Sequence, residues 1–244
     1  MILLIIGVLG GFGTCATLHF FKQYISVFPA EKEWERPRII IDNNCTIPSR
    51  VRGILYGENI DVIVESMINS IKYLISAGAT KIIIACNTAH FYLDKIYNIL
   101  PESRNYVVNI IDNLVAHLSL TKVNRVYLMA TEGTILSNIY QTKLNDRNIE
   151  CLSPSIEEFP IIRNFIEAVK KNNCYRETIS KFIDFVYNKS LIGGGKLILG
   201  CTELPVLYEQ CVGEFQGIMV YDPCLMVLKD LKIQFDNFNS KEGF

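Results

Sequence analysis

Two segments, one in each half of the chain, share one order of residue types: an apolar run, a small residue, a cysteine and then polar residues. Residues 81–90 read Lys-Ile-Ile-Ile-Ala-Cys-Asn-Thr-Ala-His, and residues 196–205 read Lys-Leu-Ile-Leu-Gly-Cys-Thr-Glu-Leu-Pro. This order is typical of a buried strand, a sharp turn and the start of a helix. The repeat therefore predicts two related α/β units that carry Cys86 and Cys201 at equivalent strand ends.

A second pair of segments supports this duplication. An apolar run at residues 2–7 leads into a glycine-rich turn at 10–13, and a run at 125–130 leads into a Gly/Thr turn at 131–134. Strands that alternate with helical segments favour parallel sheets, whose ligands bind beyond the carboxyl ends of the strands. We predict an α/β fold of two pseudo-symmetric Rossmann-like domains, with mostly parallel sheets and an active-site cleft between them.

We expect the first domain to take residues 1–112 together with about 212–244, and the second to take residues 113–211. Half of the 244 residues are hydrophobic, as expected for strands that are buried on both faces.

Composition excludes several classes of function. The net charge is -1 and no basic stripe appears, so we expect no nucleic-acid partner. The apolar start lacks a basic leader and is too short to span a bilayer, which favours a cytoplasmic protein without a membrane partner. The eight cysteines include no Cys-x-x-Cys, and the three histidines form no ligand pair, so we expect reduced thiols and no metal.

The matched cysteines favour chemistry over simple packing. A thiol at a helix start is stabilised as the thiolate by backbone N–H groups and the helix dipole. One thiolate could remove a proton from a carbon while the other thiol returns one to the opposite face. A nucleophilic cysteine with a histidine base is the alternative, since His90 follows Cys86 by four residues, but no histidine follows Cys201 in this way.

Two further positions are candidates for binding an anion. Arg50 ends a polar loop after the second predicted strand, where its planar guanidinium could hold a carboxylate through two hydrogen bonds. The glycines around Gly11 lack the dinucleotide-binding spacing. We interpret Gly11 as a place where the backbone approaches a small anionic ligand, or as part of a tight turn.

Together these motifs resemble the aspartate/glutamate racemase superfamily, and more closely its aspartate racemases. Glutamate racemases carry a histidine where this chain has Glu203. The segments that carry the resemblance are Gly10–Thr17, Asn43–Arg50, Ala85–His90, Ala130–Tyr140 and Gly200–Pro205.

The resemblance implies a cofactor-independent amino-acid racemase, most readily one that interconverts L- and D-aspartate, and a homodimer. Cys86 and Cys201 would be the two catalytic bases. Arg50 would bind the side-chain carboxylate together with a lysine, which is Lys171 by spacing with Lys170 as the alternative. The residues implied to hold the α-carboxylate are Asn87, Thr88, Thr131 and Thr202.

Several other activities remain open at this level. They are racemisation of glutamate or of several amino acids, a hydantoin racemase, a decarboxylase, and a non-catalytic amino-acid-binding protein. Decarboxylases tend to need one thiol, so the presence of two disfavours that activity.

Overall fold

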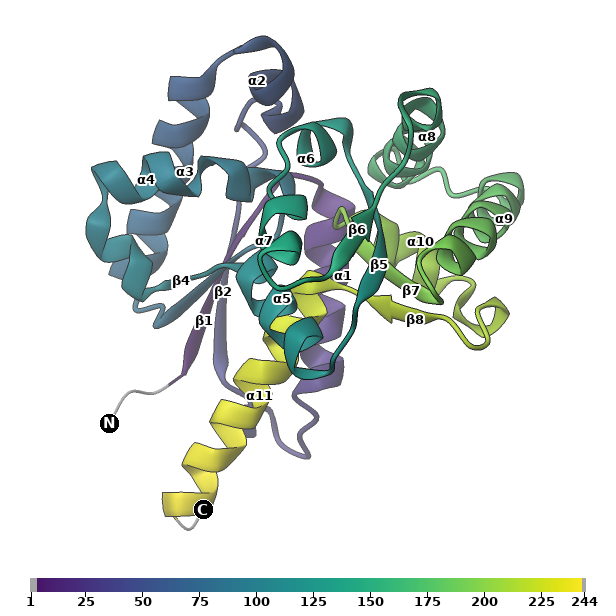
Figure 1. Cartoon of the computed structure of the whole chain (residues 1–244). Coiled ribbons are helices and arrows are strands. Elements are labelled where there is room, and N and C mark those ends of the chain that lie inside the picture. The colour runs from purple at the N-terminus through teal and green to yellow at the C-terminus, as the bar shows by residue number, and fades with distance from the viewer. Residues whose placement is uncertain (1–3, 243–244) are drawn as a thin grey trace.

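The computed structural model describes residues 4–242 and contains two four-stranded sheets, each with all its strands parallel (Figure 1). The predicted α/β fold with two Rossmann-like units is confirmed. The first sheet has the order β2-β1-β3-β4, with β1 at Ile5–Gly10, β2 at Arg38–Asn43, β3 at Lys81–Ile84 and β4 at Val107–Val108. The second has the order β6-β5-β7-β8, with β5 at Arg125–Ala130, β6 at Glu150–Leu152, β7 at Lys196–Gly200 and β8 at Met219–Tyr221.

The two sheets have the same topology, so β1 corresponds to β5 and β3 to β7. In both sheets the strand that precedes a cysteine pairs with the central strand that leads into a Gly/Thr turn. The first strand was predicted to begin at Ile2, and residues 2 and 3 lie outside the described range.

Helices pack on both sheets. Those of the first half are α1 (Thr14–Val27), α2 (Arg50–Tyr56), α3 (Ile60–Ser76), α4 (Leu93–Ile99) and α5 (Ile110–Leu120). Those of the second half are α6 (Glu132–Leu136), α7 (Gln141–Asn145), α8 (Phe159–Lys170), α9 (Arg176–Ile192), α10 (Leu204–Glu209) and α11 (Pro223–Glu242). One hydrophobic cluster contains residues of both sheets, such as Val8 and Leu128, together with residues of α1, α5 and α11. The halves therefore share a core.

Three local features shape the segments around the site. The polar loop that was predicted to end at Arg50 gives way to helix α2, which begins where Ser49 accepts a hydrogen bond from the Arg52 N–H. The segment after Thr131 forms two short helices, α6 and α7, with Asn138 between them in the left-handed region at φ 56°. The segment after Cys86 begins as a 3₁₀ turn before α4.

The course of the chain after residue 212 also differs from the expected domain limits. β8 pairs with β7 and so belongs to the second sheet, although the first domain was predicted to resume at about 212. The following α11 then packs on α1 and α5. No helix within residues 4–242 is long and apolar enough to cross a membrane.

Candidate active site

The two cysteine motifs lie against one another. Cys86 and Cys201 follow the ends of β3 and β7, and both side chains are buried, at 8% and 6% exposure. The Thr202 hydroxyl donates a hydrogen bond to the Ala85 carbonyl oxygen at 3.3 Å, which joins the residues beside the two thiols. Equivalent strand ends of the two sheets thus meet in one site, as parallel α/β sheets favour.

Glu203 places a carboxylate inside this site. Its side chain is only 3% exposed, and its Oε2 accepts a hydrogen bond from the Cys201 thiol at 3.0 Å. A Cβ added at Gly13 would lie 2.1 Å from the Glu203 Oε1, so the carboxylate needs a glycine there. The sequence analysis used Glu203 only to separate two branches of a superfamily and did not identify it as a site residue.

The charges around the two thiols differ. Burial raises the pKa of Cys86, the nearby Arg50 guanidinium lowers it, and the Glu203 carboxylate raises it. Burial and the Glu203 carboxylate raise the pKa of Cys201 well above its ordinary value, while the Lys170 ammonium acts in the opposite direction. Each thiol has one cation that lowers its pKa and the Glu203 carboxylate that raises it; the cation has the larger influence of the two at Cys86, and the carboxylate has the larger influence at Cys201.

Arg50 is held by three hydrogen bonds to backbone, and its Nε is left without a partner. Its guanidinium donates to the carbonyl oxygens of Ile47, Pro48 and Phe12 at 2.9–3.1 Å and lies 4.6 Å from the centre of the Phe12 ring. Its Nε is buried and has no hydrogen-bond partner within the described residues, which include no ion-pair partner for Arg50 either. A buried donor without a partner is costly, and a bound carboxylate would satisfy it.

Asn87 also presents an unpartnered donor. Its Oδ1 accepts from the Tyr140 hydroxyl at 2.5 Å, which fixes the amide, and its Nδ2 is buried without a partner in the described chain. Tyr140 is fully buried in the second half, so one half orients an amide of the other.

The predicted threonines form a junction between the halves. Thr88 follows β3, whereas Thr131 and Thr134 follow β5, and their three hydroxyl oxygens lie 2.9–3.0 Å from one another. Thr134 was not predicted as a site residue, although it belongs to the Gly/Thr turn that marked the second unit.

Gly11 has a structural role. Its φ is 84°, and a Cβ added there would lie 2.3 Å from the backbone carbon of Asn44. The structure therefore shows Gly11 packed closely against the loop that leads to Arg50, and the approach of a small anionic ligand to its backbone stays a prediction. Gly11 lets that loop pack against the turn after β1.

The structure brings Lys170 to the site and not Lys171. Lys170 lines a pocket of about 180 Å³ between the halves and is close enough to Cys201 to affect its pKa. Lys171 is exposed beyond the end of α8. Helix periodicity explains the difference, since Lys170 lies one turn after Ile166 on the same face of α8. The pocket is lined by Ser49, Val51, Ala130, Thr131, Glu132, Phe159, Ile162, Arg163, Ile166, Glu167 and Lys170.

His90 does not activate Cys86. Its Nε2 accepts from the Ile110 N–H at 3.3 Å, so its Nδ1 carries the proton and donates to the Cys86 carbonyl oxygen at 2.9 Å. Burial lowers the pKa of His90 to about 4, and the ring is neutral at physiological pH. With both nitrogens bonded to backbone, His90 supports the turn after β3 and is not placed as a base for the thiol.

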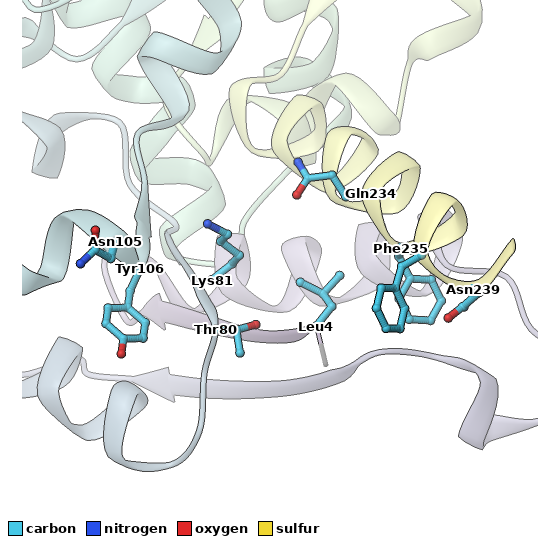
Figure 2. Close-up of a pocket in the computed structure, with 9 residues that line it drawn as sticks. Leu4, Thr80, Lys81, Asn105, Tyr106, Gln234, Phe235 and Asn239 are labelled. Carbon is cyan, nitrogen blue, oxygen red and sulfur yellow. The ribbon is translucent and has the colours of Figure 1, made fainter. Parts of the chain in front are cut away.

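A separate cavity of about 470 Å³ lies between the amino ends of β1 and β3 and helix α11 (Figure 2). Lys81 lines it at the start of β3, whereas Cys86 follows the end of that strand. This cavity is therefore not part of the cysteine site. Residues 4–242 contain no cluster of histidine, cysteine and carboxylate side chains suited to a metal ion.

Comparisons with known proteins agree on one family. The model of the Asp/Glu/hydantoin racemase family matches residues 9–231. The solved aspartate racemase of Picrophilus torridus is 31% identical, with a TM-score of 0.77 and 94% of each chain covered. An aspartate racemase homologue from Pyrococcus horikoshii OT3 is 25% identical, with a TM-score of 0.71, covering 95% of this chain and 98% of that one.

Glutamate racemases match as well. That of Sulfurihydrogenibium sp. (strain YO3AOP1) is 27% identical over 171 residues, which are 67% of this chain and 62% of the relative. The chain thus spans somewhat less than two thirds of that relative's length.

Proposed function

The chain belongs to the Asp/Glu/hydantoin racemase family, and we propose that it is a cofactor-independent amino-acid racemase that interconverts L- and D-aspartate. The observation that carries the proposal is the meeting of two equivalent strand ends, each followed by a buried cysteine, through the hydrogen bond from Thr202 to the carbonyl oxygen of Ala85 beside Cys86. Inversion at a carbon needs a base on one face and an acid on the other, and two strand ends from two halves suit that need.

The proton balance of the reaction is simple. One cysteine, as the thiolate, takes the proton from Cα and becomes a thiol, leaving a carbanion. The other cysteine, as the thiol, gives its proton to the opposite face of Cα and becomes a thiolate. The protein ends the turnover with its charge on the other sulfur, and the reverse reaction restores it.

The unpartnered donors supply the binding part of the proposal. The buried Nε of Arg50 would pair with the side-chain carboxylate, because a rigid guanidinium near the first thiol lacks an acidic partner in the described chain. Asn87 Nδ2 and the hydroxyls of Thr88, Thr131 and Thr202 would hold the α-carboxylate. Two cations, Lys170 and Arg50, would then lie near the bound substrate. A substrate with two carboxylates suits two cations, which favours a dicarboxylic amino acid.

Glutamate is the second candidate substrate, because glutamate racemases are among the relatives. Glu203 argues for aspartate, since the branch of the superfamily that acts on glutamate carries histidine at that position.

The test measures two quantities on the same samples: inversion of the amino acid and exchange of its Cα hydrogen for deuterium. The purified protein would be incubated in deuterium oxide with each enantiomer of aspartate and of glutamate, without added pyridoxal phosphate. Chiral chromatography would measure inversion, and mass spectrometry would measure deuterium at Cα. We expect inversion with deuterium incorporation for aspartate above that for glutamate. Faster glutamate turnover would make glutamate the substrate, and binding without exchange for every amino acid would identify a non-catalytic binding protein.

A further inference from the structure

The cavity of about 470 Å³ between the first sheet and helix α11 has the makeup of a ligand site (Figure 2). Sites for small molecules typically have volumes of roughly 300–1,000 Å³, with apolar walls and a small number of polar groups. This cavity combines apolar and aromatic side chains, such as Leu4 and Phe235, with three amides and the ammonium of Lys81. It therefore has the size and the mixture of groups that bind a small organic molecule.

Aromatic rings line this cavity on two sides. Tyr106, just before β4, lies on one side, and Phe235 of α11 lies on the other (Figure 2). Phe238, about one helical turn after Phe235, lines the same cavity. Packing holds both sides in place, because the Tyr106 carbonyl oxygen accepts from the Ile82 N–H at 2.8 Å and the Phe235 ring meets the Phe28 ring edge-on at 5.8 Å between centres. A space already formed between aromatic rings suits a flat apolar group.

Lys81 places a cation in the wall of the cavity. It is half-buried at the start of β3 and forms no ion pair within residues 4–242. The described residues that line the cavity include no carboxylate. An ammonium that is partly removed from water gains from an anionic partner. Lys81 therefore favours a ligand with a negative charge.

The charges of this cavity also favour a different ligand from that of the cysteine site. A free amino acid carries an ammonium beside its carboxylate, and that ammonium would have no acidic partner among the described lining residues. The second carboxylate of a dicarboxylic amino acid would compete with the first for Lys81. One cation between aromatic rings instead fits a ring that carries a single carboxylate.

We propose that this cavity is a second binding site, separate from the cysteine site, for a small aromatic monocarboxylate. The carboxylate pairs with the Lys81 ammonium, and the ring lies between Tyr106 and Phe235. One wall belongs to the first sheet and the other to α11, which follows β8 of the second sheet. A bound ligand therefore links the first sheet to a helix that enters from the second, and it stabilises the folded chain.

Isothermal titration calorimetry with indole-3-acetate as the probe tests this proposal. Indole-3-acetamide keeps the ring and loses the charge, and tryptophan adds an ammonium to a similar ring and carboxylate. We expect both to bind roughly 10-fold more weakly than indole-3-acetate, because one lacks the ion pair with Lys81 and the other brings an unpaired charge. Equal binding of all three compounds would show that the ring alone is recognised and would overturn the anion site.

Variants place the probe in the cavity. Lys81→Met removes the cation with little change in side-chain length, and it should weaken binding of indole-3-acetate by roughly 10-fold. Lys72→Met, at an exposed lysine of α3, is the matched control and should leave binding unchanged. Phe238→Ala removes part of the apolar wall and should also weaken binding. Thermal melts would show that the variants are folded, and the probe should raise the Tm of the wild type more than that of Lys81→Met.

The outcomes separate this proposal from the proposed racemase activity. Binding of the probe needs no turnover, so a failed racemase assay leaves this test unaffected. Arg50→Leu changes the cysteine site and should leave binding of indole-3-acetate intact. A wild-type protein that binds no indole-3-acetate at millimolar concentration would overturn the proposal. So would binding that Arg50→Leu abolishes and Lys81→Met leaves unchanged, because the probe would then occupy the cysteine site.

Discussion

The ends of β3 and β7 share a backbone plan but differ in their charges. Each strand ends in a small residue and a buried cysteine, and Gly200 is needed because a Cβ there would lie 2.7 Å from Leu128. Cys86 has the Arg50 cation nearby, whereas Cys201 donates to the Glu203 carboxylate. The comparison shows that the two motifs supply equivalent backbone positions, and that Glu203, which has no counterpart in the first motif, and Arg50, which lies outside both motifs, make the two thiols chemically unequal. Burial raises the pKa of both thiols, and the Glu203 carboxylate adds to this most strongly at Cys201, so we expect Cys86 to lose its proton more readily than Cys201.

Removal of either thiol tests whether inversion needs both Cys86 and Cys201. Cys86→Ala and Cys201→Ala should each lower the rate of inversion by at least about 10²–10⁴-fold, because one face of Cα then lacks its acid or base. Chiral chromatography measures this rate. Cys174→Ala, outside the site, is the control and should keep activity. Near-normal inversion in either variant would exclude the two-base reaction.

Removal of the Arg50 cation tests the role of positive charge beside Cys86, at the end of β3. Arg50→Leu should weaken aspartate turnover by about 2–5 kcal/mol in transition-state binding, since the substrate carboxylate loses its partner in a buried place. Kinetics with aspartate measure the effect.

The same helix offers a matched control for Arg50. Arg52→Leu removes an exposed arginine that pairs with Glu58, and it should change turnover little. Equal losses in the two variants would show that net charge, and not the position of Arg50, controls turnover.

Neutralisation of the Glu203 carboxylate tests the role of negative charge beside Cys201, at the end of β7. Glu203→Gln removes the negative charge that raises the pKa of both thiols, so both pKa values should fall. Thiolate then forms at lower pH, and both limbs of a bell-shaped pH–rate profile should move to lower pH. The profile of kcat/KM measures this shift, with Glu209→Gln as a control at a largely exposed carboxylate. Unmoved limbs would show that Glu203 has no electrostatic role.

Two neighbouring lysines give the smallest expected effect. Lys170→Met should reduce aspartate turnover by about 1 kcal/mol or less, because the ammonium is partly exposed and screened by solvent. Lys171→Met should have no measurable effect. A larger loss from Lys171→Met would contradict the placement of these side chains in the structure.

The sequence was informative about the fold wherever local patterns decide it. The alternation of apolar strands with helical segments predicted both sheets, and the two cysteine motifs predicted which strand ends would meet. Glu203 was missed because its burial depends on Gly13, 190 positions earlier in the chain. The choice between Lys170 and Lys171 depends on where α8 ends and which face it turns inward, and spacing between motifs does not encode that rotation.

The hydroxyl contacts among Thr88, Thr131 and Thr134 set a limit on how the two halves can hold a ligand. Three hydroxyl groups carry three protons, and a closed ring of three hydrogen bonds uses all of them. A carboxylate that accepts from one of these hydroxyls withdraws a proton from the ring, which then has two bonds. If the substrate carboxylate accepts from a hydroxyl whose bond joins Thr88 to Thr131 or Thr134, ligand binding and cohesion between the halves would compete for the same proton, and occupancy of the site would weaken the contact between the halves.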